Sequence, residues 1–365
     1  MKRVLILLLL LIAFNSFSHA IEISGDVYGT WTADNNPYEV IADLRVPQCS
    51  TLIIEPGCYI DFQGCYAFII DTSACLMAIG TSSDSIVFTA SDTVSRWLGI
   101  NFFNADSNCI INHCIIEWGT SALEGDDFTK GGGVACYYTN IEISNNFFKY
   151  CNGIIFGGGL YCKHSSITIS DNIFIENRTW LLGAAICCEY SDALIANNII
   201  KDNIAYHQLG GERGGGIYCG YSDVVIRGNI IANNVSGAEG GGVYTYRCNV
   251  LVESNIICSN LAYSYDGGIA VFGPANVTSE YYYNNLIYGN EAGISGGGLN
   301  ARNIINFENN TICNNIANWM GGGLKVGPEF IEEPLMNNII RGNTAGVGPQ
   351  IYGDVDSFTV ICSNI

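Results

Sequence analysis

The chain has few charged residues, and positive charge is especially scarce. Only 13% of its 365 residues are charged, and 15 lysines and arginines stand against 34 aspartates and glutamates, for a formal net charge of −19. An acidic surface of this kind repels nucleic acids and anionic lipids. Both are therefore excluded as partners, and acidic polysaccharides are disfavoured unless a metal ion bridges the charges.

Long apolar runs are also missing beyond the first residues. The opening stretch, MKRVLILLLLLIAFNSFSHA, has Lys2 and Arg3, then an apolar segment, then small residues that end at Ala20. This order predicts a cleaved signal peptide over residues 1–20. The apolar segment is shorter than the ~20 residues that cross a bilayer. We therefore expect an exported chain, secreted or on the cell surface, without membrane insertion.

No segment shows a 3.6-residue apolar period with helix caps, and leucine is too sparse for a leucine-rich repeat. A repeat is present nonetheless. Glycine-rich phrases such as GGGLYC and GGGIYC recur at steps of 25 to 31 residues. They begin at Gly131, Gly157, Gly183, Gly214, Gly240, Asp266, Gly296, Gly321 and, in degenerate form, Gly346.

Asparagines form two further markers at fixed spacing. The first set is Asn146, Asn172, Asn198, Asn229, Asn255, Asn285, Asn310 and Asn338. The second set follows five residues later, at Asn177, Asn203, Asn234, Asn260, Asn290, Asn315 and Asn343, with Cys151 in the first place. Markers that recur in this way identify a solenoid.

The residues between the markers predict short strands. In SSITISDNIF and SDVVIRGNII, isoleucine and valine alternate with polar residues and are bounded by glycine or asparagine. We therefore expect an all-β fold, a right-handed parallel β-helix with three short strands per coil of 25–26 residues. About eleven coils are expected over residues 49–365, with residues 21–48 as an N-terminal cap.

The markers themselves are interpreted as structural. Equivalent residues of successive parallel coils lie about 4.8 Å apart, so inward-facing asparagines can bond to one another and to buried turn backbone. Glycines allow the tight corner before each strand. Cys136, Cys162, Cys188 and Cys219 are expected to form an inward column, and both free thiols and disulfide bridges fit this spacing.

These phrases resemble the right-handed parallel β-helix repeats of pectin-lyase-like bacterial proteins. The GGG-I-Y and NN-x-I-x-x-N phrases are also similar to the repeats of polymorphic outer-membrane-protein-type surface proteins. TLIIEPGCYIDF and RWLGINFF resemble the first coils of secreted members. The resemblance implies a fold that carries lyases, hydrolases, epimerases and noncatalytic adhesins alike, so it does not assign an activity.

Catalytic motifs of those enzymes are not found. A hydrolase of this fold would need clustered aspartates and a Gly-His-Gly, and a lyase would need acidic metal ligands beside a basic residue. Asp192 and Asp223 occupy equivalent positions, near the separation of glycosidase carboxylates, but both lie in YSD phrases typical of turns. We predict no catalytic residue, no metal site and no cofactor.

Binding residues are predicted on both sides of the glycine-rich strand. Tyr161, Tyr218 and Tyr244, four residues after the first glycine, are expected to point outward and to floor a groove. Seven residues after it, one ring per coil and a final guanidinium form a second column, namely Tyr138, His164, Tyr190, Tyr221 and Arg247. Stacked rings that only stabilise a parallel sheet are the structural alternative.

Longer segments at 206–213, 273–283 and 326–334 flank the same strand, which favours a binding face there. We therefore expect a noncatalytic, adhesin-like module for a polysaccharide or a surface protein. The alternative is a carbohydrate-active enzyme, a polysaccharide lyase or glycoside hydrolase, with its groove over the glycine strand. The chain ends in SFTVICSNI without a polar cap, so further coils or a partner are expected to cover that end.

Overall fold

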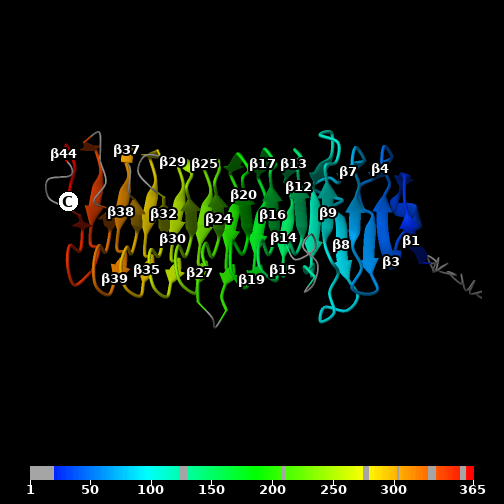
Figure 1. Ribbon diagram of the computed structural model, residues 1–365, viewed down its shortest axis with the longest axis horizontal. Coiled ribbons are helices and arrows are strands. Elements are labelled where there is room, and N and C mark those ends of the chain that lie inside the picture. Colours follow the sequence, from blue (N-terminus) through cyan, green and yellow to red (C-terminus); the bar gives the residue numbers. More distant parts are fainter. Residues whose placement is uncertain are drawn as a thin grey trace, which may run out of the picture.

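The computed structural model describes residues 20–122, 130–207, 210–273, 279–301, 304–327, 334–353 and 359–365. Over these residues the chain is a right-handed parallel β-helix of about twelve turns, which confirms the expected fold class. The turns stack into a straight rod with the chain advancing from one end to the other (Figure 1). The described residues contain one short helical turn, the 3-10 helix Ala33–Asn35. The predicted signal peptide falls almost wholly on residues 1–19, outside the described part.

A 13-stranded parallel sheet takes one strand from each turn. Its strands are β2 (Gly29–Trp31), β4 (Thr51–Ile54), β7 (Cys75–Ile79), β10 (Ile110–Asn112), β13 (Glu142–Ser144), β17 (Ile167–Ser170), β21 (Ala193–Ala196), β25 (Asp223–Arg227), β29 (Asn249–Glu253), β33 (Glu280–Tyr283), β37 (Ile304–Glu308), β41 (Leu335–Met336) and β44 (Val360–Ile361).

A 24-stranded sheet consists of two ladders that meet at β3 (Tyr38–Val46), which also pairs with β1 (Ile21–Asp26). Ladder A1 comprises β5 (Tyr59–Phe62), β8 (Ile86–Ala90), β11 (Cys114–Glu117), β14 (Phe147–Lys149), β18 (Ile173–Ile175), β22 (Ile199–Lys201), β26 (Ile230–Ala232), β30 (Ile256–Cys258), β34 (Leu286–Tyr288), β38 (Thr311–Cys313) and β42 (Ile339–Arg341).

From residue 134 on, ladder A2 holds the strands that follow the glycine-rich phrases. It comprises β6 (Phe68–Ile70), β9 (Ile100–Phe103), β12 (Val134–Tyr137), β16 (Leu160–Lys163), β20 (Ile186–Glu189), β24 (Ile217–Gly220), β28 (Val243–Tyr246), β32 (Ile269–Phe272), β36 (Leu299–Ala301), β40 (Leu324–Val326) and β43 (Ile351–Tyr352).

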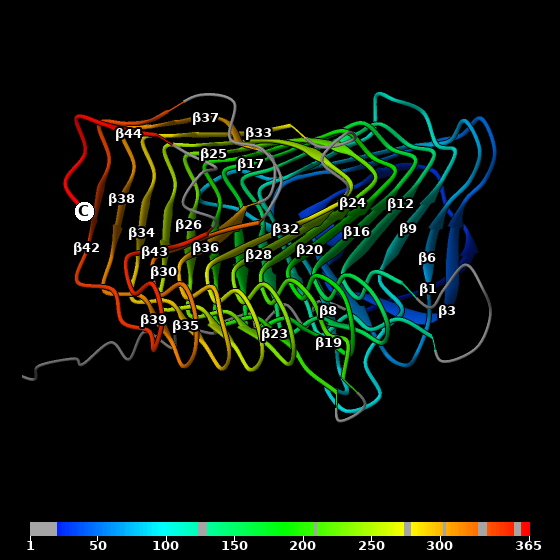
Figure 2. The same ribbon diagram turned by 60° about the vertical axis from the view of Figure 1, so that its left-hand side comes forward.

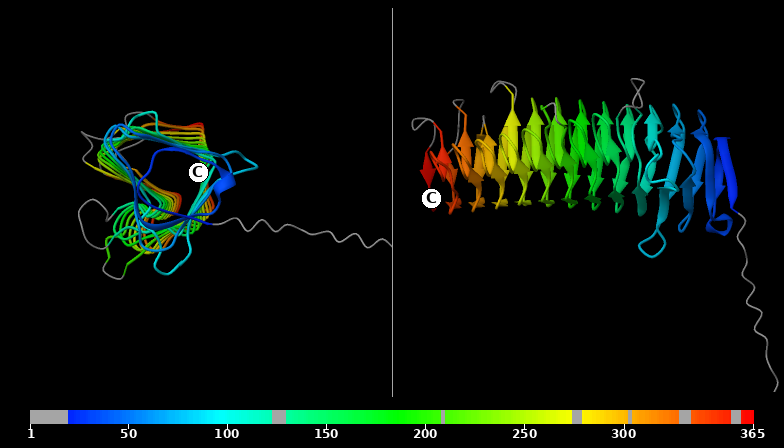
Figure 3. Two further views of the ribbon diagram at one scale, coloured as in Figure 1. Left: turned by 90° about the vertical axis from the view of Figure 1, so that its right-hand side faces the viewer. Right: turned by 90° about the horizontal axis from the view of Figure 1, so that it is seen from below.

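A 7-stranded sheet of two-residue strands lies between ladders A1 and A2 in the central coils. It comprises β15 (Asn152–Gly153), β19 (Arg178–Thr179), β23 (Ile204–Ala205), β27 (Val235–Ser236), β31 (Leu261–Ala262), β35 (Glu291–Ala292) and β39 (Ile316–Ala317). Viewed along the rod, the faces enclose a common interior (Figure 3, left), and an oblique view shows the successive turns stacked in register (Figure 2).

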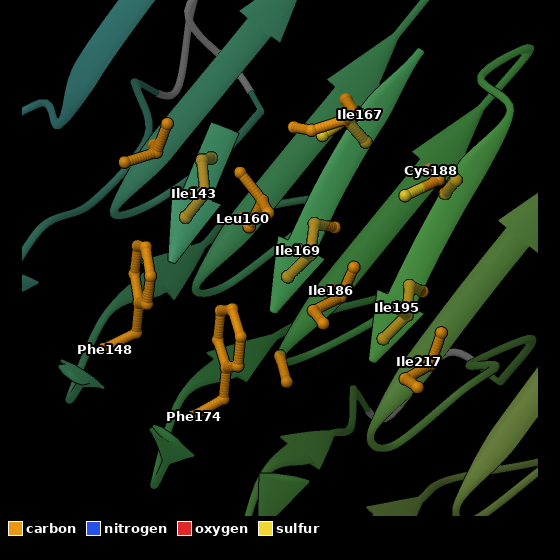
Figure 4. Close-up of a cluster of buried hydrophobic side chains, with 14 of the residues drawn as sticks. Ile143, Phe148, Leu160, Ile167, Ile169, Phe174, Ile186, Cys188, Ile195 and Ile217 are labelled. Atoms are coloured by element: carbon orange, nitrogen blue, oxygen red, sulfur yellow. The ribbon is translucent and has the colours of Figure 1, made fainter. Parts of the chain in front are cut away.

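Register explains the core. Because each strand pairs in parallel with its counterpart one turn later, like side chains stack on like, as in Ile143, Ile169 and Ile195. Phe148 and Phe174 stack with ring centroids 4.6 Å apart (Figure 4). Cys162 and Cys188 pair in the same way, and the predicted inward cysteine column is fully buried. All sixteen cysteines are free thiols in this structure.

Both asparagine columns face inward and are buried, as predicted. Asn229 is typical, since its Oδ1 accepts the backbone N–H and Nδ2 of Asn198 at 2.8 and 3.0 Å, while its own Nδ2 donates to Asn255 at 3.1 Å and to the Ile195 carbonyl at 2.8 Å. Each asparagine thereby satisfies corner backbone that water cannot reach.

The glycines are needed for close approach of the backbone. Gly157 has φ +60°, and a Cβ there would lie 2.6 Å from the Leu160 carbonyl oxygen. Residues 21–46 form β1, β2 and β3, which pair in parallel with the first coils. The cap role expected for residues 21–48 stays a prediction.

Candidate functional site

An exposed column of rings runs along the corner between ladder A2 and the 13-stranded sheet, here called the ring corner. Four rings stack one after another along the rod, namely Tyr138, His164, Tyr190 and Tyr221. The centroids of successive rings are 4.8, 5.1 and 4.8 Å apart, and the angles between successive ring planes are 18, 24 and 6°. The three tyrosines are 62, 47 and 41% exposed. The Arg247 guanidinium closes the stack, 5.7 Å from the Tyr221 centroid. These five predicted residues therefore lie together on one surface.

The backbone of these residues is unusual for their type. Tyr138, His164, Tyr190, Tyr221 and Arg247 all have φ between 51 and 55°, the left-handed region that bulky residues rarely adopt. Most equivalent corners elsewhere carry asparagine, aspartate, glycine or serine. A left-handed conformation costs a residue with a Cβ roughly 1–2 kcal/mol. The rings are placed in a backbone conformation that their residue types disfavour, and this favours a function for the column.

A column of serine and threonine side chains, which the sequence analysis did not predict, stabilises this corner through hydrogen bonds. The Oγ of Ser165 accepts the backbone N–H of Thr139 at 3.1 Å, and the Oγ of Ser191 accepts that of Ser165 at 3.0 Å. Each hydroxyl follows a ring residue directly in the chain, and that recurring pair was the available signal. It plays the same part here that asparagine plays at the other corners.

The stacking leaves ring edges, not faces, open to solvent. At about 5 Å, nearly parallel rings cover each other, so the column presents phenol hydroxyls and an imidazole edge once per turn. The first face of Tyr138 is different, because the preceding turn carries the small Asn104 at that position. A depression of about 230 Å³ lies there, lined by Thr72, Phe103, Asn104, Tyr137 and Tyr138.

The other predicted column is not an accessible floor. Tyr161, Tyr218 and Tyr244 do leave the main core, as expected from strand alternation, but they are only 0, 7 and 3% exposed. They pack with one another and with neighbours such as Phe156 and Leu182 in a second apolar cluster. The expectation of an open tyrosine groove over the glycine strand is therefore wrong.

Residues just before the glycines cover these tyrosines. Four such residues pair with one another through single backbone bridges, one per turn, namely Lys130, Phe156, Leu182 and Arg213. Their side chains lie over ladder A2. Lys130 Nζ lies 5.2 Å from the Tyr161 ring centroid, and the Arg213 guanidinium lies 5.2 Å from that of Tyr244. The recurring large residue before each glycine run was the signal that the sequence interpretation did not use.

Polar contacts also tie down this buried layer. Tyr161 donates its hydroxyl to Glu189 Oε2 at 2.6 Å and accepts from Lys130 Nζ at 3.3 Å. Burial raises the pKa of the Tyr161 phenol, and the charge of Glu189 adds to the effect. A neutral, enclosed phenol of this kind stabilises the corner and does not face a ligand.

Asp192 directly precedes β21 and Asp223 is the first residue of β25, so the turn position predicted for both is wrong, and their carboxylates bond the next coil. Asp192 Oδ1 accepts the backbone N–H of Asp223 at 2.9 Å, and Asp223 Oδ1 accepts Nδ2 of Asn249 at 2.8 Å. One oxygen of each carboxylate thus bonds its neighbour in the next turn.

A second depression, of about 690 Å³, lies at the corner between ladder A1 and the 7-stranded sheet, here called the arginine corner. It is lined by Arg96, Trp118, Tyr150, Cys151, Glu176, Arg178, Asp202 and Ile204. Arg96 comes from the loop after β8, which stands out from the side of the rod (Figure 1). Sequence reasoning missed this site because Arg96 lies far along the chain from the residues it meets.

A short ring stack ends inside this depression. The Trp118 ring contacts both the Arg96 guanidinium, which lies 5.3 Å from its centroid, and Tyr150, whose ring centroid is 4.4 Å away. Arg96 also donates to the Tyr150 carbonyl oxygen. The next turns carry Glu176 and Asp202 at the corner position, and Lys149 Nζ lies 5.6 Å from the Tyr150 ring centroid.

Metal and cofactor sites were not expected. Among the described residues, no group of three or more histidine, cysteine, aspartate or glutamate side chains is arranged to hold a metal ion. Burial raises the pKa of the Cys151 thiol at the arginine corner to about 12, so it is a poor nucleophile.

The described residues contain no helix with the length and apolarity that a bilayer crossing requires.

The long segments are only partly visible. Residues 274–278 and 328–333 of the two later ones lie outside the described residues. In the first, the backbone N–H of His207 donates to the buried Glu212 at 2.8 Å, and the His207 ring packs on Trp180 with centroids 4.9 Å apart. Trp180 directly follows β19, so this contact joins the segment to the end of that strand.

Comparisons with known proteins bear on the fold. No family model matches the chain, and no curated protein matches its sequence. Among solved structures, a variant of the periplasmic alginate epimerase AlgG aligns at 14% identity over 90% of this chain and 74% of that one, with a TM-score of 0.50. An alginate lyase from Paenibacillus aligns at 14% identity over 88% and 94%, with a TM-score of 0.29. At this identity the likeness shows the fold alone, a right-handed parallel β-helix.

Proposed function

We propose that this chain is an exported protein that binds a polysaccharide along the ring corner. The observation that carries the proposal is the unbroken exposed stack from Tyr138 to Tyr221, closed by Arg247 and built on left-handed backbone. At most other corners residues such as asparagine or glycine fill this position, so a corner forms without a ring there. The rings are therefore retained for what they contact.

The chemistry of the column fits a sugar polymer. Its edges offer hydroxyl groups and an imidazole at intervals of about 5 Å along the rod, and each can donate or accept a hydrogen bond. A linear glycan presents hydroxyls at regular intervals, so a chain laid along the rod would meet one protein group per turn. The open face of Tyr138, above its depression, suits one pyranose ring stacked on an aromatic plane.

Export is supported by the signal-like opening of the sequence and by the solved neighbour that is described as periplasmic. Polysaccharide as the ligand class agrees with the same neighbours, which act on alginate. A surface protein as ligand remains the competing outcome of the binding test.

A polysaccharide-modifying enzyme is the second candidate. The structural neighbours named above are an epimerase and a lyase. The observation in this chain that favours it is the arginine corner, where Glu176 and Asp202 share a concave site with two arginines. Proton transfer needs carboxylates or bases within reach of a bound sugar. In this depression, Glu176 and Asp202 supply two carboxylates.

The deciding experiment compares the wild type with the double variant Tyr190→Asn, Tyr221→Asn on a panel of soluble polysaccharides. Asparagine accepts the left-handed backbone, so the rings are removed without strain. The matched control is Tyr263→Asn, an exposed tyrosine outside the column. We expect the double variant to lose at least about tenfold in affinity while the control does not change.

Unchanged affinity in the double variant would contradict the ring-corner proposal. Incubation of each bound polysaccharide with the wild type, followed by chromatography of products, tests the enzyme candidate. Product that disappears in Glu176→Gln or Asp202→Asn would make catalysis at the arginine corner the function.

A further inference from the structure

The arginine corner contains two guanidinium groups that form no ion pair among the described residues, although Glu176 and Asp202 line the same depression. These are the guanidinium groups of Arg96 and Arg178. Of the other described arginines, Arg45, Arg213 and Arg227 are each paired with a carboxylate at 2.8 to 2.9 Å, whereas Arg247 and Arg341, like Arg96 and Arg178, form no ion pair within the described part of the chain. Two unpaired arginines at one place are unexpected in a chain where acids outnumber bases more than twofold.

Their environment strengthens the case for an anion. Arg96 is held by the Trp118 ring and the Tyr150 carbonyl, so its position is set before any ligand arrives. Burial lowers the pKa of Arg96, and the positive charge of Arg178 acts in the same direction. The two groups therefore repel each other, and an anion between them would relieve that repulsion.

The rest of the depression fits the ring of a sugar. Tyr150 lines the depression and stacks on Trp118, and Lys149 Nζ lies 5.6 Å from its ring centroid, so the part of the ring that faces the depression is available to a ligand. Glu176 lies one turn further and is exposed, with no ion pair to a described base. It can accept hydrogen bonds from sugar hydroxyls, whereas Asp202 already has Lys201 at 3.7 Å.

We propose that the arginine corner binds a carboxylate-bearing sugar, with its ring on Tyr150, its carboxylate on Arg96 and Arg178, and its hydroxyls on Glu176. This deepens the polysaccharide proposal and rests on it for the ligand class. Guanidinium groups bind carboxylates through strong, charge-assisted hydrogen bonds.

The net charge of the whole molecule restricts the ligand further. At −19 the protein repels a long polyanion, although two local arginines accept a single carboxylate. Screening weakens the long-range repulsion with a decay length of about 10 Å at 0.1 M salt, while a partly buried pair is screened less. The ligand is therefore a largely neutral glycan with isolated acidic sugars, and not a continuous polyuronate.

The test uses three probes with the full exported chain: a neutral oligosaccharide that carries one uronic acid, the same oligosaccharide with that carboxyl group reduced to an alcohol, and a polyuronate of matched length. Calorimetry measures each affinity in wild type, Arg178→Gln and Tyr150→Asn. Arg227→Gln, on the 13-stranded sheet, is the matched control for loss of one arginine.

We expect the single-carboxylate probe to bind at least about tenfold more tightly than its reduced form, and Arg178→Gln to remove that difference without weakening the reduced probe. Tyr150→Asn should weaken both. Added salt should weaken the single-carboxylate probe and strengthen the polyuronate.

Equal affinity for the carboxylate and reduced probes, or tighter binding of the polyuronate at low salt, would overturn this inference. The Tyr190→Asn, Tyr221→Asn variant separates the two proposals. If it binds all probes as the wild type does while Arg178→Gln does not, the ring corner fails as a site and the arginine corner stands.

Discussion

At the scale of single residues, the ring corner balances two effects of similar size. Each ring in the left-handed region loses roughly 1–2 kcal/mol relative to its preferred backbone. Each stacked pair of rings gains about 0.5–1.5 kcal/mol, and Tyr190 has a stacked neighbour on both sides. Stability alone therefore explains neither the presence nor the absence of a ring.

From this balance we predict that Tyr190→Asn changes the free energy of unfolding by less than about 1 kcal/mol. Asparagine relieves the backbone strain and loses the two stacking contacts, so the terms nearly cancel. Chemical denaturation with a β-sheet circular dichroism signal measures it. A loss above 2 kcal/mol would show that the rings are scaffold, and Tyr263→Asn is the control.

Residue accessibility also predicts thiol chemistry. Twelve of the sixteen cysteines are buried, Cys313 is intermediate, and only Cys49, Cys65 and Cys362 are exposed. Burial raises the pKa of Cys109 to about 12, which keeps it protonated at neutral and mildly alkaline pH. Thiolate is the reactive form, so such groups are inert.

We therefore expect iodoacetamide at pH 8 to label Cys49, Cys65 and Cys362 in the native protein, with Cys313 slower. Mass spectrometry of peptides gives the positions, and unfolding in denaturant before labelling is the control. Rapid native labelling of Cys136 or Cys188 would contradict the buried column. Absence of label after reductant-free unfolding would instead reveal bridges formed in an oxidising compartment.

At the scale of one element, each corner depends on a side chain from the next turn. Replacing Asn229 with leucine removes the acceptor of the Asn198 backbone N–H and the donor to the Ile195 carbonyl. Each buried group left without a partner costs about 1–3 kcal/mol. We expect Asn229→Leu to destabilise by about 3 kcal/mol or more in denaturant unfolding.

The matched control is Asn314→Gly, an exposed asparagine with φ 56° at another corner. Glycine adopts that backbone freely, so this variant should unfold close to the wild-type midpoint. If Asn229→Leu unfolds there too, the inward column does not stabilise the corners.

The glycine-side strand gives a second prediction at this scale. Tyr161 is fully buried, bonded to Glu189, and packed with Phe156 at a centroid distance of 6.0 Å. Large-to-small substitution of a buried aromatic ring costs about 3–5 kcal/mol. We expect Tyr161→Ser to lose about that much stability. A variant as stable as the wild type would mean that the ring is open to solvent after all.

At the scale of the whole molecule, about twelve turns spaced near 4.8 Å predict a rod about 60 Å long. Small-angle scattering should give the pair-distance distribution of an elongated particle, and circular dichroism should show strand with negligible helix. A compact, near-spherical distribution would be inconsistent with the stacked coils in Figure 1.

The sequence by itself determined the coil. Glycines, asparagines and alternating isoleucines recur at nearly constant spacing, and in a parallel stack equal spacing places equal residues on top of one another. The inward direction of Asn229 and Cys188 and the ring column from Tyr138 to Arg247 both follow from that local rule. Such features need only one repeat and its neighbour to be predicted.

Only the tertiary structure decided what covers each face. Tyr161 leaves the core as strand alternation requires, yet Lys130 and Phe156 from a different corner close over it. Arg96 meets Tyr150 because the loop after β8 folds across two turns, a contact that no period encodes. Accessibility and the pairing of charges depend on the cross-section of the coil and on irregular loops, and a repeat pattern carries no information about either.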